Sequence, residues 1–413
     1  MNEANTPIAA LGGRLTSVDA LRGLVMVLMA LDHTRDFLQD MRIDPLNPAT
    51  TTVPLFFSRW ITHFCAPVFV FLAGASAYLM GALGKGRSPG QLARFLISRG
   101  AFLMLLELTA VRLGLTFRWS LDGMFLQVIW AIGLSLVVLG LLIGAGLSPR
   151  WIGALGALIV LSHNLLDLGV SPSEDIFERG RASGSLLFTF LLRPGPLPLA
   201  PGITWFEAYP LLPWLGVMAL GYAFGVVLVR ERRARVRITA LLGLAATVAF
   251  VLLRAGAFYG DPRPFQAQGT VVQSMMAFLN CRKYPPSLLY VLMTLGPGLV
   301  VLAALDFSEG EIALRGQLAG LPRLVLVILG RVPLFFYLLQ WPAIRVVTNM
   351  FRAADGQEIH WLSSPFRNPS ADGLSLPVVY LAWAVVVAIL SIPCQWYAGL
   401  KRRRRDWKWL SYL

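Results

Sequence analysis

Long apolar stretches recur along the whole chain and leave few folds open to it. Many approach the roughly 20 residues that a helix needs to cross the hydrocarbon core of a bilayer. The 413 residues are 56% hydrophobic and only 14% charged, whereas an ordinary soluble protein has about 25% charged residues. The sequence therefore predicts an all-α, polytopic membrane helix bundle, with residues 1–413 forming a single transmembrane domain.

Hydropathy predicts about ten membrane-spanning helices. The ninth contains Gly330-Arg331-Val332-Pro333, which can break it into two pieces. An apolar run at residues 185–192 is too short to span, so it is expected to be re-entrant, interfacial or simply packed on the bundle. The predicted helices cover residues 20–38, 60–84, 92–115, 122–147, 150–168, 207–229, 236–256, 287–305, 323–350 and 376–399.

Basic residues predict the orientation. Arginine and lysine cluster after the second span, between the sixth and seventh, and after the tenth. Ten spans put all three clusters on one side, so both termini are expected in the cytoplasm. Residues 1–19 would be a cytoplasmic segment and 400–413 a basic interfacial tail. The net charge of +14 then indicates loops that face anionic lipid, and nucleic acid is not an expected partner.

Targeting and disulfide signals add little. The first apolar run is long, interrupted by charges and lacks a small-residue cleavage site, so it is expected to remain as the first span. Cys65 and Cys394 fall in predicted spans, and no disulfide framework is indicated for them and Cys281.

The first span carries charge at both ends. Residues Ser17 to Asp36 read SVDALRGLVMVLMALDHTRD. Ionisable groups at membrane depth are costly, so Asp32 and His33 indicate a functional site. At the other end, Arg22 either snorkels to the surface or binds a phosphate, with Asp19 holding it. The basic clusters on that side can attract an anionic donor such as acetyl-CoA.

Polar residues of separate spans share one depth. With a rise of 1.5 Å per residue, His33 lies roughly 20 Å into a core about 30 Å thick. Similar arithmetic places the other polar groups in the same outer half of the membrane, where they are expected to line one hydrated cavity. These groups are His63, Glu107, Gln127, His163 and Gln340.

Two mechanisms fit an imidazole in such a cavity. His33 can accept a proton from a substrate amine or hydroxyl, or it can attack an activated acyl group and form an acyl-imidazole. Asp36, at i+3, is better placed than Asp32 to orient the ring, and Glu107 is a third candidate. His63 either assists or bonds backbone freed by Pro67.

The two remaining histidines are expected to be structural or superficial. His163 lies near a helix end, and His360 lies in a loop. No histidine pair has metal-binding spacing, so no metal is expected.

The segment VDALRGLVMVLMALDH resembles the first span of transmembrane acyltransferases, particularly relatives of heparan-alpha-glucosaminide N-acetyltransferase. In the broader group a histidine follows the arginine by eleven residues, as His33 follows Arg22. The segment from Cys65 to Gly81, CAPVFVFLAGASAYLMG, is similar to the second span of the glucosaminide group. The segment from Gly330 to Pro342 is similar to a late span in bacterial relatives.

The resemblance implies transfer of an acetyl or other acyl group from cytoplasmic acyl-CoA to an acceptor across the membrane, often a sugar. It implies that His33 is catalytic. In the glucosaminide group the acetyl-bearing histidine comes later, and here the next histidine is His63. Gln340 stands where many bacterial relatives carry histidine. The expected location is a bacterial inner membrane, with lipids and a second copy of the chain as further partners.

A transporter or flippase is the rival hypothesis. The same buried charges can form a substrate or proton pathway, and the rival shares every feature of the predicted topology. Labelling by acetyl-CoA favours the enzyme, whereas transport without any donor favours the rival.

Overall fold

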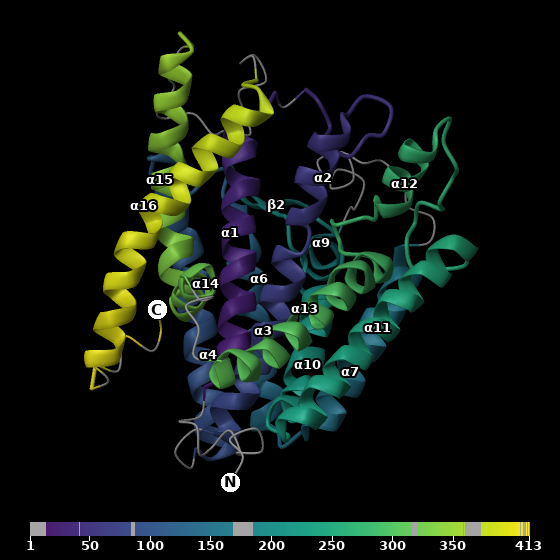
Figure 1. Cartoon of the computed structure of the whole chain (residues 1–413), viewed down its shortest axis with the longest axis vertical. Coiled ribbons are helices and arrows are strands. Elements are labelled where there is room, and N and C mark those ends of the chain that lie inside the picture. Colours follow the sequence, from purple (N-terminus) through teal and green to yellow (C-terminus); the bar gives the residue numbers. More distant parts are fainter. Residues whose placement is uncertain are drawn as a thin grey trace.

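The computed structural model in Figure 1 describes residues 14–40, 42–83, 87–167, 185–315, 321–357, 359, 373–404, 406–407, 410 and 412. His360 and most of the segment 1–19 lie outside them. The described chain is mostly helical, and each of the ten expected stretches is largely helix. The α-helices are α1 (Thr16–Leu38), α2 (Val53–Thr62), α3 (Cys65–Ala82), α4 (Pro89–Leu106), α5 (Arg112–Thr116), α6 (Val128–Gly144), α7 (Pro149–Ser162), α9 (Leu186–Leu191), α10 (Leu211–Leu228), α11 (Arg232–Gly256), α12 (Val271–Leu279), α13 (Leu288–Arg315), α14 (Leu321–Arg331), α15 (Pro333–Ala354) and α16 (Leu376–Arg403).

Helix α1 runs through the middle of the bundle (Figure 1). It packs against α14, α15 and α16 on one side, and against α3 and α13 on the other. Its closest neighbour is α14, where two glycines let the backbones touch. A Cβ on Gly23 would overlap the Leu326 carbonyl, and one on Gly330 would overlap the Asp19 carbonyl. Small residues at helix crossings allow this close packing within membranes, and the crossing fixes where α1 presents its charged ends.

The remaining helices pack in pairs around this centre. Helix α4 packs on α6, α10 packs on α3 and α7, and α11 packs on α13. Glycines again sit at the contacts. Gly100 and Gly133 face each other between α4 and α6, and Gly74 approaches the Met218 carbonyl between α3 and α10. The segment 185–192, expected to be too short to span, forms the short helix α9.

Two of the long helical stretches are interrupted near the polar residues. After α4, the π-helix η3 (Glu107–Val111) starts at Glu107 and leads into α5. Helices α14 and α15 meet at 96°, which confirms the expected break at Gly330-Arg331-Val332-Pro333. Pro333 begins α15, where its missing N–H is tolerated because no intrahelical partner is lost.

A small sheet lies beside the bundle, and hydropathy did not predict it. Its strands are β1 (Phe125–Leu126), β2 (Gly195–Ala200) and β3 (Ile203–Glu207). β3 lies in the centre, parallel to β1 and antiparallel to β2. Because residues 125–126 are strand, the fourth predicted helix starts later than expected, at Val128.

Within the described residues, five helical stretches are long and apolar enough to cross a membrane, or six if the bent pair α14–α15 counts as one broken span. Helix α1 is not among them, and it carries Asp19, Arg22, Asp32, Arg35 and Asp36. The chain is therefore a largely helical protein with several helices that are long and apolar enough to cross a membrane. The full set of ten spans and the cytoplasmic position of both termini stay predictions.

Candidate functional site

A cavity of about 640 Å³ opens beside the N-terminal half of α1. We call it the basic pocket. Its walls come from α1, α3, α4, α6, α15 and the C-terminal ends of α14 and α16. Six cations line it: Arg14, Arg22, Arg87, Arg99, Arg331 and Lys401. Asp19 is its one lining carboxylate among the described residues, so the pocket has a surplus of positive charge.

Asp19 arranges several of these cations. Its carboxylate is buried and accepts a hydrogen bond from Arg14 Nε at 2.6 Å and one from Arg22 Nη1 at 3.3 Å. Arg331 Nε lies 3.7 Å from the same carboxylate. Arg22 also donates to the Gly330 carbonyl at 3.2 Å and to Ser76 Oγ at 2.7 Å. The predicted pair Asp19 and Arg22 therefore lies in the wall of the pocket, where one carboxylate holds three guanidinium groups.

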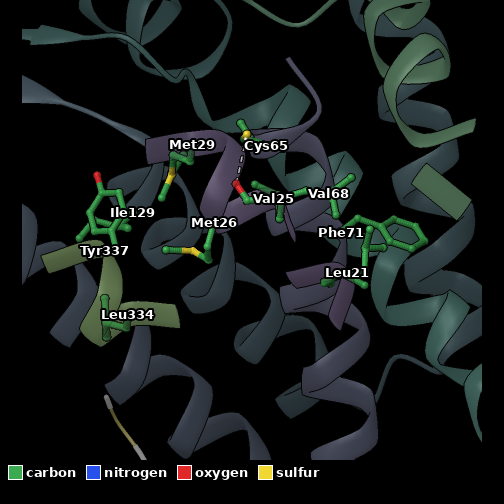
Figure 2. Close-up of a cluster of buried hydrophobic side chains, with 14 of the residues drawn as sticks. Leu21, Val25, Met26, Met29, Cys65, Val68, Phe71, Ile129, Leu334 and Tyr337 are labelled. Carbon is green, nitrogen blue, oxygen red and sulfur yellow. Dashed lines mark hydrogen bonds between the residues drawn. The ribbon is translucent and has the colours of Figure 1, made fainter. Parts of the chain in front are cut away.

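The deep part of the basic pocket is apolar. Met26 and Met29 of α1 line it together with Ile129 of α6 and with Leu334 and Tyr337 of α15. Figure 2 shows these side chains gathered in one cluster. Cys65 lies in the same region and donates from Sγ to the Val25 carbonyl at 3.3 Å. A ligand filling this pocket would place an anionic part among the arginines and an apolar part between the two methionines and α15.

His33 lies one helical turn beyond the deep end of the pocket. It follows Met29 by four residues, and Trp341 follows Tyr337 by four, so each shares a helix face with a pocket-lining residue. The His33 and Trp341 rings are in contact, with centroids 4.2 Å apart and planes at 42°. His33 is half-buried. This ring pair therefore forms a layer directly beyond the apolar end of the pocket.

Beyond that layer lies a charge cluster made of Asp32, Arg35, Asp36, Arg59 and Lys283. Arg59 Nη1 donates to both Asp32 oxygens at 2.5 and 2.6 Å. Arg35 Nη2 lies 3.0 Å from Asp32 Oδ1 and 2.5 Å from Asp36 Oδ1. Thr62 Oγ1 also donates to Asp32, at 2.8 Å. Asp32 and Asp36, two of the three carboxylates predicted as partners of His33, thus bind guanidinium groups, and they act on His33 as nearby charges.

His63 lies at the break between α2 and α3 and is fully buried. Its ring packs edge-on against Tyr290 at 5.4 Å, and the Tyr290 hydroxyl donates to the His63 carbonyl at 2.8 Å. Neither ring nitrogen has a hydrogen-bond partner within the described part of the chain. Asp32, Arg59 and Lys283 act electrostatically on His63, as they do on His33. The two predicted histidines therefore adjoin the same charges.

Glu107 belongs to a different set of groups. Its carboxylate is buried near the backbone amides of Gln127 and Trp130, and it acts electrostatically on Tyr337 and Glu207. The charges that act on His33 are instead Asp32, Asp36, Lys283 and Arg59. Gln340 is also fully buried. The single polar layer expected from depth alone is thus divided, with histidines around the charge cluster and Glu107 near the small sheet.

His163 is held by backbone groups, as its predicted structural role requires. Its Nε2 lies 2.8 Å from the Pro286 carbonyl oxygen, and its Nδ1 lies 3.0 Å from that of Ile159. The contact ties the end of α7 to the segment that precedes α13. Among the described residues, no three His, Cys, Asp or Glu side chains are grouped to hold a metal ion.

Sequence analysis missed three residues of this region. Arg59 comes from α2, and Lys283 and Tyr284 come from the connection before α13. The Tyr284 hydroxyl lies 3.4 Å from that of Tyr209. Burial acts to raise the pKa of Tyr284, but the Lys283 ammonium and the Arg59 guanidinium outweigh it and hold that pKa below its ordinary value. Burial and the neighbouring phenol raise the pKa of Tyr209.

Comparison with known protein families gives one match. The family described as heparan-alpha-glucosaminide N-acetyltransferase, catalytic, matches residues 14–259. The match covers more than half of the 413 residues and includes α1, α2, α3 and the walls of the basic pocket that come from α4 and α6. No curated protein matches the chain.

Proposed function

Because the chain belongs to the heparan-alpha-glucosaminide N-acetyltransferase catalytic family, we propose that it is a membrane-embedded acyltransferase. It transfers an acetyl or other acyl group from cytoplasmic acyl-CoA to an acceptor on the outer side of a bacterial inner membrane. The acceptor is a sugar or amino sugar. One observation carries the proposal, namely a pocket with a cationic wall and an apolar deep end that finishes one helical turn from His33.

The basic pocket suits the two halves of acyl-CoA. Phosphate groups bind guanidinium groups through strong charge-assisted hydrogen bonds, and Arg22 and Arg331 stand at the start of α15, whose N-terminus also favours anions. The uncharged arm and its acyl group extend along Met26 and Met29. The thioester then lies below the His33–Trp341 layer.

His33 is the group that moves the acceptor's proton. The acceptor nitrogen or oxygen forms a bond to the thioester carbonyl carbon, the C–S bond breaks, and the proton passes through the imidazole to the departing CoA thiolate. The alternative order forms an acyl-imidazole on His33 first. In both orders the half-buried ring must face the thioester and the acceptor in turn. His63 has an assisting role, because its ring is buried and the same charges act on it.

The charged residues around His33 have distinct roles in this proposal. Asp32 and Asp36 hold Arg35 and Arg59, and Asp32, Asp36 and Arg59 act as charges on the imidazole. Asp19 positions the donor-binding Arg22. Glu107 acts electrostatically on Tyr337, which lines the deep end of the pocket, and is not assigned to His33.

The test uses the purified chain in detergent with radiolabelled acetyl-CoA and amino sugar acceptors. We expect acetyl transfer by the wild type and none by His33→Ala, with CoA binding retained because His33 is not part of the pocket wall. His360→Ala serves as the control, since the sequence predicts that this histidine lies in a loop. Full activity of His33→Ala would refute its role, and transport by proteoliposomes without donor would favour a transporter.

A further inference from the structure

The cations of the basic pocket fall into two groups that different parts of the fold hold in place. The first group surrounds the Asp19 carboxylate between α1 and α14, and it consists of Arg14, Arg22 and Arg331. The second group comes from α4, from the connection before it and from the end of α16, and it consists of Arg87, Arg99 and Lys401. The pocket therefore presents positive charge from two separately built walls.

Aromatic rings support two cations of the second group. Lys401 Nζ lies 5.8 Å from the centroid of the Tyr397 ring, and this ring stacks on Phe335 of α15 with centroids 4.3 Å apart. The Arg87 guanidinium carbon lies 4.9 Å from the centroid of the Phe95 ring. The face of a ring attracts a cation but does not neutralise it. Both cations are thus oriented while they keep their charge for a ligand.

The chain after α16 connects the two walls of this second group. The Tyr412 ring packs against Phe95 and Phe102 of α4, with centroids 5.5 and 5.7 Å apart. Its hydroxyl shares a hydrogen bond of 2.8 Å with Ser98 Oγ. Leu410 is buried in the hydrophobic core. Phe95, Ser98 and Phe102 share one face of α4, at spacing i, i+3 and i+7, so Tyr412 fastens the end of α16 to this helix.

Such a fastening matters because like charges that line one cavity repel each other. A bound anion relieves this repulsion, and a cavity lined by one sign of charge concentrates ions of the opposite sign. The rings of Phe95, Tyr397 and Tyr412 hold the cations in place without any ligand. A site that is fixed in advance binds its ligand at a lower cost in conformational entropy.

The proposed donor carries phosphate at two separate places. A diphosphate joins its pantetheine arm to adenosine, and a phosphate monoester sits on the ribose 3′-oxygen, farther from the thioester. Arg22 lies one helical turn before Met26, on the way to the apolar deep end, so the first cation group meets the diphosphate. The second group, on the other walls of the same cavity, then remains for the monoester, with which cations form charge-assisted hydrogen bonds.

We propose that Arg87, Arg99 and Lys401 form a second phosphate subsite, which binds the ribose 3′-phosphate of CoA, and that Tyr412 is its positioning residue. This inference rests on the proposed acyltransferase function. It gives the end of α16 and the chain after it, which lie outside the family match at residues 14–259, a part in donor recognition. Lipid headgroups carry the same phosphate chemistry, and the test separates the two sources.

The test titrates the purified protein in neutral detergent with CoA and with dephospho-CoA, which lacks only the 3′-phosphate. We expect the wild type to bind CoA about 10- to 100-fold more tightly, since hydrogen bonds to a charged group are lost in dephospho-CoA. Lys401→Met should weaken CoA binding about tenfold and leave dephospho-CoA binding nearly unchanged. Arg402→Met removes the neighbouring exposed cation, which does not line the pocket, and should change neither affinity.

Tyr412→Ala tests the positioning role, because it removes no charge. We expect the ratio of the two affinities to fall about threefold. Tyr412→Phe loses the hydrogen bond to Ser98 but keeps the ring contacts, and should retain more of the ratio. A merely structural role would weaken the binding of both ligands alike and leave the ratio unchanged.

Equal affinity of the wild type for CoA and dephospho-CoA would overturn the inference, and so would equal weakening of both ligands in Lys401→Met. We expect the discrimination to persist when phosphatidylglycerol is added to the micelles. Its loss there would assign the subsite to lipid headgroups instead. If the wild type binds neither ligand and transfers no acetyl group, the proposed function itself fails, whereas binding of both with equal affinity contradicts this inference alone.

Discussion

The two ends of α1 both pair aspartate with arginine, yet they are built differently. At the Thr16 end, Asp19 contacts three guanidinium groups beside a cavity of about 640 Å³. At the Leu38 end, Asp32 and Asp36 each bind guanidinium groups tightly within the bundle. At the Thr16 end, one aspartate among many cations leaves positive charge available to bind an anionic ligand. At the Leu38 end, the aspartates and arginines balance each other, and their main effect is to fix the helices around His33.

Asp32→Ala should give the largest effect, because Asp32 binds two guanidinium groups inside the bundle at the Leu38 end of α1. Removing this buried carboxylate takes the carboxylate partner of Arg59 away and leaves Arg35 with Asp36 alone, and breaking a buried pair costs about 3–5 kcal/mol of unfolding free energy. Thermal unfolding in detergent measures the loss. Asp19→Ala is the matched variant at the Thr16 end, where Arg14 is more than half exposed. We expect it to lose clearly less unfolding free energy. Equal losses would remove the distinction between the two ends.

Arg22→Gln tests ligand binding in the basic pocket at the Thr16 end of α1. We expect CoA to bind about 10- to 100-fold more weakly, since a hydrogen bond to a charged group contributes about 1.5–3 kcal/mol. Titration of the purified protein with CoA measures this change. Arg87→Gln removes an exposed cation of the same pocket and should have a smaller effect. Unchanged affinity in Arg22→Gln would place the phosphates elsewhere.

Met29→Ala tests the apolar part of the basic pocket. The shortened side chain leaves room for a longer acyl group, and each buried methylene contributes about 0.8 kcal/mol. We expect the kcat/KM ratio of butyryl-CoA to acetyl-CoA to rise about tenfold. Met218→Ala removes another buried methionine, which lies outside the pocket, and should not change the ratio. If both variants behave alike, the acyl group does not reach Met29.

The smallest effect concerns the phenol pair beside the charge cluster. Because Lys283 and Arg59 outweigh burial at Tyr284 and lower its pKa, Tyr284 should ionise before an ordinary tyrosine as the pH rises. Tyrosinate absorbance should therefore begin at a lower pH in the wild type than in Tyr284→Phe. Tyr209→Phe removes the hydrogen bond between the phenols and should move the onset back upward. Identical titration curves would show that the cluster does not act on Tyr284.

Local sequence signals predicted α1, its charged ends and the break at Gly330-Arg331-Val332-Pro333, because apolar length and proline placement are encoded within a few turns. The small sheet escaped, since β1 pairs with β3 across about 80 residues and its two apolar residues run directly into an apolar helical stretch. Lys283 escaped for a related reason. A lysine in a connection ordinarily reports topology, and only the fold brings Lys283 close enough to the charge cluster to act on Asp32.

The helical rise per residue placed His33, His63 and Glu107 at one depth in the membrane. Depth alone does not say which face of each helix is turned inward. Asp32 faces Arg59 and Glu107 faces Gln127 and Trp130. Whether His33, His63 and their neighbours catalyse acyl transfer stays a prediction that the variants above address.

The contact between His33 and Trp341 has a consequence for the cell as well as for the reaction. A continuous water-filled channel through a membrane that carries a proton gradient would let protons leak across it. If the proposed transfer crosses this layer, the transferred group passes two tilted rings that contact each other beyond the deep end of the cavity, and a closed contact there would keep the bulk water on the two sides separate.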